Sequence, residues 1–73
     1  MEFNELKQRI EMQDDIPFFY KGKDYVILAW YEGGPLLCDC QNEFNNKQFK
    51  DAEDFLSHCE LDGKNIKDIL KFL

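Results

Sequence analysis

The sequence predicts an α+β domain in which helices cover an antiparallel sheet. Apolar residues recur with helical spacing near both ends of the chain. Between these ends, aromatic and β-branched residues form runs separated by glycine-containing turns, which is typical of β-hairpins. We expect the order α-β-β-β-α-α within a single domain, residues 1–73, because a chain of this length has room for only one hydrophobic core.

The first expected element is a short helix over residues 4–12. Phe3, Leu6 and Ile10 lie at positions i, i+3 and i+7, which places them on one stripe of a helical surface. Polar residues and Pro17 then end the helical pattern.

A β-hairpin is expected next, between residues 18–21 and residues 25–31. Residues 22–23, a Gly-Lys pair, would form the two-residue turn that joins them. In that register Phe18 faces Ile27 across the hairpin. The second run is the longest and most apolar, so we expect it to be the central strand.

A second hairpin completes a three-stranded meander. A two-residue turn at residues 33–34 would lead into a strand over residues 36–41, so that Ile27 faces Cys40. Residues 47–49 form either a short fourth strand or an extended entry to the next helix.

Two C-terminal helices are expected after the sheet. Asp51 can serve as an N-cap, and apolar residues follow at i, i+3, i+4 and i+7: Ala52, Phe55, Leu56 and Cys59. An Asp-Gly pair at residues 62–63 is expected to end this helix. A last helix from about residue 65 shows the same stripe: Ile66, Ile69, Leu70 and Leu73.

The two faces of the expected sheet differ in composition. One face carries no charge and is the expected main core, covered by the C-terminal helices: Phe18, Tyr20, Tyr25, Ile27, Ala29, Tyr31, Leu36, Cys38 and Cys40. The other face is apolar at its centre and polar at its rim: Phe19, Lys21, Asp24, Val26, Leu28, Trp30, Leu37, Asp39 and Gln41. Either the N-terminal helix lies across this second face, or part of the face stays open.

An open second face would be an interaction surface. Its candidate partner-binding residues are Trp30, Phe19 and Leu37, with Asp39 at the acidic rim. A homodimer formed through the same residues is an alternative to a different protein partner.

The net charge argues against nucleic acid as a partner, and the length of the apolar runs argues against a membrane-spanning segment. The chain carries 15 acidic and 9 basic residues, a formal net charge of −6, which disfavours contact with a phosphate backbone. The longest uninterrupted apolar run, residues 25–31, is too short to cross a bilayer, and the N-terminus does not resemble a signal peptide. We therefore expect a cytoplasmic protein.

One group of residues has the composition of a metal site: Cys38, Cys40, His58 and Cys59. A Cys-x-Cys pair within a strand and two adjacent ligands about 100° apart on a helix suit tetrahedral zinc poorly. Packing of the cysteines in the core is the preferred interpretation, with no metal and no cofactor. A metal- or redox-responsive protein remains an alternative function.

No catalytic arrangement is expected, so the protein is predicted not to be an enzyme. His58 could act as a general base only with a positioned nucleophile or a substrate pocket, and the sequence supplies neither. The carboxylates at residues 51–54 are explained by the dipole of the helix that they begin.

Three motifs resemble those of a group of small uncharacterised α+β proteins from low-GC Gram-positive bacteria and their phages. The motifs are FFYKGKDY at residues 18–25, AEDFL at residues 52–56 and DGKNIKDIL at residues 62–70. The resemblance covers residues 17–71. It implies a compact α+β domain without an assigned activity, and it transfers no functional residue to this chain.

The expected function is therefore that of a non-enzymatic module that acts through protein–protein contact. A phage origin would also suit an acidic inhibitor that mimics nucleic acid. The nine basic residues interspersed among the acidic ones weaken that alternative.

Overall fold

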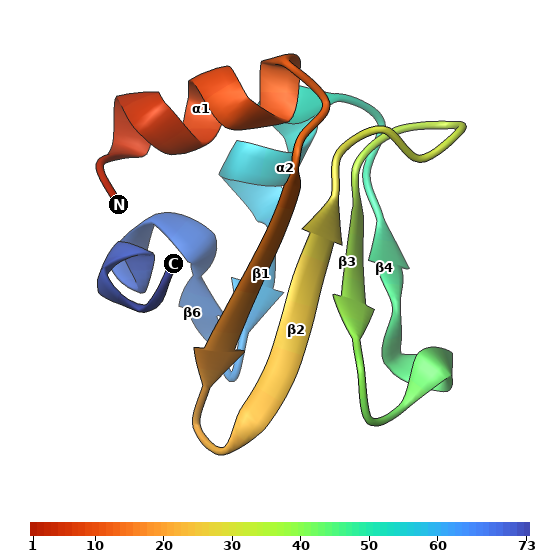
Figure 1. Cartoon of the computed structure of the whole chain (residues 1–73), viewed down its shortest axis with the longest axis vertical. Coiled ribbons are helices and arrows are strands. Elements are labelled where there is room, and N and C mark those ends of the chain that lie inside the picture. Colours follow the sequence, from red (N-terminus) through yellow and green to blue (C-terminus); the bar gives the residue numbers. More distant parts are fainter.

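The structure is a computed structural model that describes residues 1–42 and 44–73. It is an α+β fold whose four-stranded antiparallel sheet has the order β1-β2-β3-β4 (Figure 1). The elements of the sheet and its helices are α1 (Phe3–Glu11), β1 (Asp15–Tyr20), β2 (Lys23–Leu28), β3 (Leu36–Asp39), β4 (Lys47–Gln48) and α2 (Ala52–His58). A small hairpin follows, β5 (Glu60–Leu61) and β6 (Lys64–Asn65), and 3-10 turns lie at Glu43–Asn45, Ile66–Asp68 and Leu70–Phe72.

The first hairpin forms with a turn one residue earlier than expected. Lys21 and Gly22 occupy the turn, and Phe18 faces Tyr25 instead of Ile27. Because this register differs from the expected one by two residues, every side chain keeps its expected face. The φ angles of Lys21 and Gly22 are 50° and 80°, the positive values that a type I′ turn requires.

The second hairpin differs from the expected one by three residues. Ile27 faces Leu37 and not Cys40. An odd shift exchanges the two faces of a strand, so β3 is inverted relative to the prediction. The connection is the longer loop of residues 29–35, whose Gly34 lies so close to the chain that a Cβ there would be 1.9 Å from the Phe49 carbonyl oxygen.

The sheet has a fourth strand, which settles the choice left open by the sequence. β4 pairs antiparallel with β3, with Gln48 opposite Leu36. The Phe49 amide extends this pairing by donating to the Pro35 carbonyl at 2.8 Å. The predicted three-stranded meander is therefore one strand short.

The predicted last helix does not form, although two residues of its apolar stripe, Ile66 and Ile69, are buried. Asp62 and Gly63 have positive φ angles of 55° and 78° and form the turn of the β5–β6 hairpin. Two 3-10 turns take the place of the predicted helix, and they still bury Ile66 and Ile69 because their spacing of three suits a 3-10 turn.

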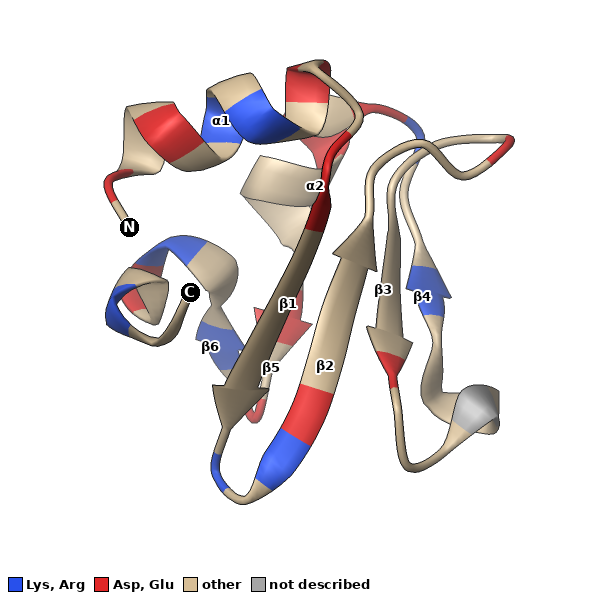
Figure 2. Cartoon of the chain, viewed as in Figure 1, with Lys and Arg blue, Asp and Glu red and all other residues tan. Residues whose placement is uncertain are grey.

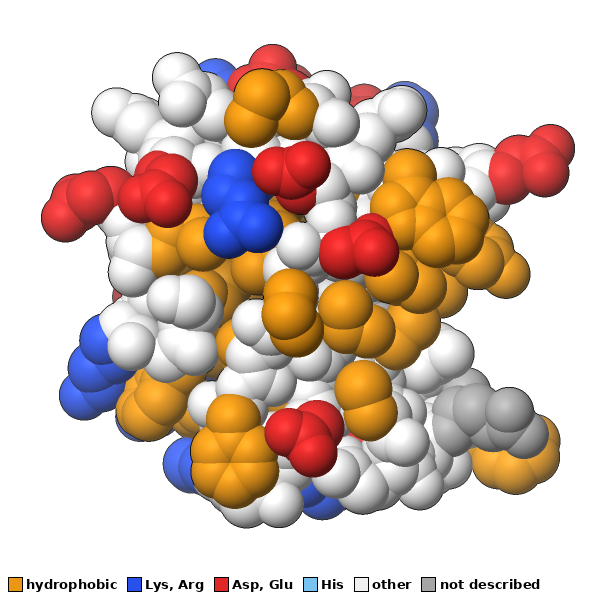
Figure 3. All heavy atoms as spheres, viewed as in Figure 1, with side chains coloured by type: hydrophobic (Ala, Val, Ile, Leu, Met, Phe, Trp, Pro, Cys, Tyr) orange, Lys and Arg blue, Asp and Glu red, His pale blue; other side chains and the backbone are white. Residues whose placement is uncertain are grey.

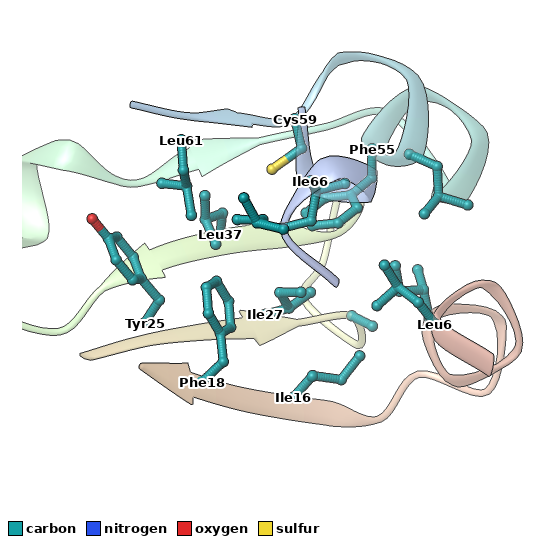
Figure 4. Close-up of a cluster of buried hydrophobic side chains, with 14 of the residues drawn as sticks. Leu6, Ile16, Phe18, Tyr25, Ile27, Leu37, Phe55, Cys59, Leu61 and Ile66 are labelled. Atoms are coloured by element: carbon teal, nitrogen blue, oxygen red, sulfur yellow. The ribbon is translucent and has the colours of Figure 1, made fainter. Parts of the chain in front are cut away.

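The buried residues form one cluster on one side of the sheet (Figure 4). Leu6 and Ile10 of α1 belong to the same cluster as Ile27 of β2 and Phe55 of α2. Both helices therefore pack on the same face of the sheet. Of the two arrangements considered for the other face, the one in which the N-terminal helix crosses it is wrong.

The inverted β3 strand can be tested by comparing two neighbouring residues. Leu37→Ala is expected to lower the free energy of unfolding by about 2–4 kcal/mol, because its side chain fills the core. Cys38→Ala, on the opposite face, is expected to change it by less than about 1 kcal/mol. Urea denaturation measures both values. The reverse ranking would show that β3 has the register expected from the sequence.

Candidate functional site

The face of the sheet away from the helices is the candidate functional site. We call it the open sheet face and define it by six residues: Pro17, Phe19, Val26, Leu28, Leu36 and Cys38. Figure 3, drawn from the same side as Figure 1, shows apolar side chains over β1–β3 with acidic side chains beside them. Apart from Leu36, these residues are half-buried or exposed, so the face is accessible.

Two large aromatic side chains lie exposed on or beside this face, as expected for the arrangement in which part of the face stays open. Phe19 is 58% exposed and lies opposite Asp24 at one end. Trp30 is 52% exposed and lies just beyond β2 at the other end. The Trp30 indole donates a hydrogen bond to the Asp15 carboxylate, and its ring centroid lies 5.9 Å from that of Tyr31. The indole is thereby oriented while much of its surface stays in water.

The other two candidate partner-binding residues are on the wrong side of the sheet for this role. Leu37 is 2% exposed and Asp39 is 3% exposed, and both face the core side of β3. The expected two-residue turn before β3 would place them beside Trp30, and that turn does not form. The open sheet face also includes three residues of the first hairpin: Pro17, Val26 and Leu28. Their position on the same face as Phe19 follows from the alternation of side chains along the strands.

Asp39 has a structural role in the connection from β3 to β4. Its carboxylate accepts hydrogen bonds from the Gln41 amide at 3.0 Å and from Asn45 Nδ2 at 3.3 Å. Lys23 Nζ lies 3.8 Å from the same carboxylate. Burial acts to raise the pKa of Asp39, but the hydrogen bonds from Asn45 and Gln41 and the charge of Lys23 outweigh it, so the pKa lies below its ordinary value.

The residues with metal-ligand composition are not brought together. Cys38 lies on the open sheet face, whereas Cys59 is buried in the core, where desolvation raises its thiol pKa to about 12. His58 is exposed, and its Nδ1 lies 2.8 Å from Asp54 Oδ1. Within residues 1–42 and 44–73, no three His, Cys, Asp or Glu side chains are placed to hold a metal ion.

The carboxylates at the start of α2 are engaged in capping that helix. Asp51 accepts a hydrogen bond from the Asp54 amide at 2.8 Å, and Asp54 in turn accepts one from the Lys50 amide at 2.9 Å. The Lys50 amide, followed by His58, holds the pKa of Asp54 below its ordinary value. This reciprocal arrangement resembles a capping box and explains the acidic residues without a catalytic role.

Charge is unevenly distributed between the two ends of the sheet (Figure 2). Residues 1–15, residue 32 and residues 50–58 carry nine acidic and three basic side chains. They account for the whole formal net charge of −6, because the rest of the chain has equal numbers of both. These segments lie at the end where β1 begins and β2 ends, next to Trp30.

Comparisons of the chain with protein-family models, with curated proteins and with solved structures found no match. None of the helices in the described part of the chain has the length and apolar character needed to span a membrane.

The role of Asp39 predicts a pH dependence of stability. A carboxyl group with a lowered folded pKa stabilises the fold above its ordinary pKa of about 3.9, and this contribution is lost as the pH falls through the lower folded value. Asp39→Asn is therefore expected to be less stable than the wild type at neutral pH. The difference is expected to shrink as the pH falls below about 4.

Urea denaturation at a series of pH values measures this effect. Asp68→Asn serves as a control, because Asp68 is exposed and its carboxylate makes no hydrogen bond within the described residues. A difference between wild type and Asp39→Asn that is independent of pH would contradict the assigned role of the carboxylate.

Proposed function

We propose that this protein is a non-enzymatic binding module that acts through protein–protein contact at the open sheet face. The observation that carries the proposal is an uncovered apolar sheet face with two half-exposed aromatic side chains, Phe19 and Trp30. Aromatic residues of this kind supply much of the binding energy in protein interfaces. Neither residue belongs to the core cluster, which lies on the other side of the sheet.

The charge around this face supports one kind of partner, a protein surface that combines apolar side chains with Lys and Arg. Asp15 and Asp24 flank the face at its two ends, and Glu32 lies in the loop that follows Trp30. The excess negative charge of the molecule lies at the Trp30 end. A basic partner would be steered toward this end and oriented on it.

An acidic inhibitor that mimics nucleic acid would use the same end of the molecule, but the local geometry favours it less. A mimic needs a regular row of free carboxylates. Here Asp14 pairs with Arg9 at 3.4 Å, and Asp51 and Asp54 are engaged at the start of α2. The apolar face and not the carboxylates is therefore the main element of the proposed interface.

A reducing compartment such as the cytoplasm fits the proposal. Cys38, Cys40 and Cys59 are all free thiols, and Cys38 lies on the open sheet face itself. Thiols persist in this form where the environment is reducing.

Selection from a displayed peptide library tests the proposed surface, because the library samples many partner sequences at once. The selected peptides are expected to combine apolar anchors with Lys or Arg. Trp30→Ala and Phe19→Ala are each expected to weaken their binding by about tenfold or more, or about 1.4 kcal/mol, because each removes an aromatic contact. Isothermal titration measures the affinities.

Phe44→Ala is the matched control, because Phe44 is also an exposed aromatic residue (92%) but lies outside the open sheet face. It is expected to leave peptide affinity unchanged. Peptides that bind Trp30→Ala and Phe19→Ala as well as they bind the wild type would overturn the proposal. So would a stable homodimer that either substitution dissociates, since the face would then be occupied by a second copy of the chain.

A further inference from the structure

A concave site lies on the core side of the sheet, at the end away from Trp30. It is a pocket of about 360 Å³ between the β1–β2 turn, β4 and the β5–β6 hairpin. We call it the lysine pocket and define it by five residues: Tyr20, Lys21, Lys23, Tyr25 and Lys47. Leu37 and Leu61 add apolar surface to its wall. Its volume is at the small end for ligand sites, which limits it to a small ligand.

The pocket is lined by three lysines together with the carboxylates of Glu60 and Asp62. The pocket contains three of the nine basic residues. Lys23 Nζ forms an ion pair with the Asp39 carboxylate at 3.8 Å, a distance too long for a direct hydrogen bond. Lys47 Nζ makes only a long contact of 3.5 Å with the Glu60 carbonyl oxygen. Since an ammonium group has three donors, both lysines can donate to a ligand.

Tyr25 directs a further donor toward the pocket. Its ring stacks on Phe18 at 5.4 Å between centroids, and the residue is only 8% exposed. Its phenol oxygen points away from the core cluster (Figure 4) and makes no hydrogen bond within the described residues. Every buried side-chain nitrogen or oxygen atom of the described residues has a hydrogen-bond partner. The Tyr25 hydroxyl has none, so it lies in the part of the side chain that solvent reaches.

Lys21 and Asp62 close the rim of the pocket and hold two turns together. Their side chains form an ion pair, although the residues are 41 positions apart in the chain. Lys21 adopts a φ of 50°, a conformation in which Asn is much better tolerated than Lys.

We propose that the lysine pocket binds the phosphate group of a small phosphorylated molecule. Each ammonium group acts as a point charge with three donors and can bind phosphate oxygens from several directions. The Tyr25 hydroxyl supplies a neutral donor beside them. Asp62 and Glu60 line the same pocket, so a bound phosphate displaces Asp62 from Lys21.

The proposal is tested by NMR titration of the full chain with glycerol phosphate and, separately, with inorganic phosphate. We expect saturable shifts at residues around the pocket, with a dissociation constant of about 1 mM or lower. Tighter binding of glycerol phosphate than of inorganic phosphate identifies an organic ligand, and equal binding identifies phosphate itself. Both outcomes support the site, whereas the absence of saturable shifts with either probe overturns it.

Substitutions at the rim give effects of opposite sign. Lys23→Gln and Lys47→Gln are each expected to weaken binding severalfold or more, and Asp62→Asn is expected to tighten it, because Lys21 loses its competing carboxylate. Lys50→Gln, at the acidic end of the molecule, is the matched control and is expected to have no effect. Equal binding by all these variants would show only non-specific attraction and would overturn the proposal.

Lys21→Asn separates binding from folding. Asn is favoured at this turn position, so the variant is expected to unfold at a higher urea concentration while binding phosphate more weakly. Loss of stability together with unchanged binding would contradict the role assigned to Lys21. Trp30→Ala is expected to leave phosphate binding unchanged, so this test is independent of the proposed protein interface.

Discussion

The pairing of Ile27 with Leu37 determines which residues of this protein are buried and which are presented to solvent. It places Leu37 beside Ile27 in the core and brings Asp39 to the side of the sheet where Asn45 and Lys23 can engage its carboxylate. A shift by one residue would put Cys38 into the core and leave Leu37 in water. The composition of both faces therefore depends on this single register.

The two proposed sites lie on opposite sides of the same hairpin and differ in chemistry. α1, α2 and the C-terminal 3-10 turns all direct their buried residues into one cluster, which leaves Phe19 and Trp30 available to a partner. The lysine pocket lies on the core side, at the end opposite to the acidic residues around Trp30. Because alternate residues of a strand face opposite sides, Phe19 belongs to the open sheet face and its neighbour Tyr20 to the pocket.

Local periodicity and capping are enough to predict the α+β class, the two amphipathic helices and the central position of β2. Asp51, for example, is identifiable as an N-cap from its place before a helical stripe, and it does cap α2. The face on which Phe19 lies follows from the alternation along the first hairpin, because a register shift of two residues leaves each side chain on its expected face. Its exposure depends on α1 packing against the opposite face of the sheet.

Contacts between distant segments decide the face of Leu37 and Asp39 and the meeting of Lys21 with Asp62. In the loop before β3, Gly34 approaches the backbone of Phe49, a residue 15 positions further along the chain, so closely that a Cβ would not fit. A local sequence pattern shows which residues of a strand alternate between the two faces. It does not show which residue of the neighbouring strand each of them pairs with. The register of β3 could therefore not be predicted from the sequence. The same holds for the faces of Leu37 and Asp39, two of the four predicted binding residues.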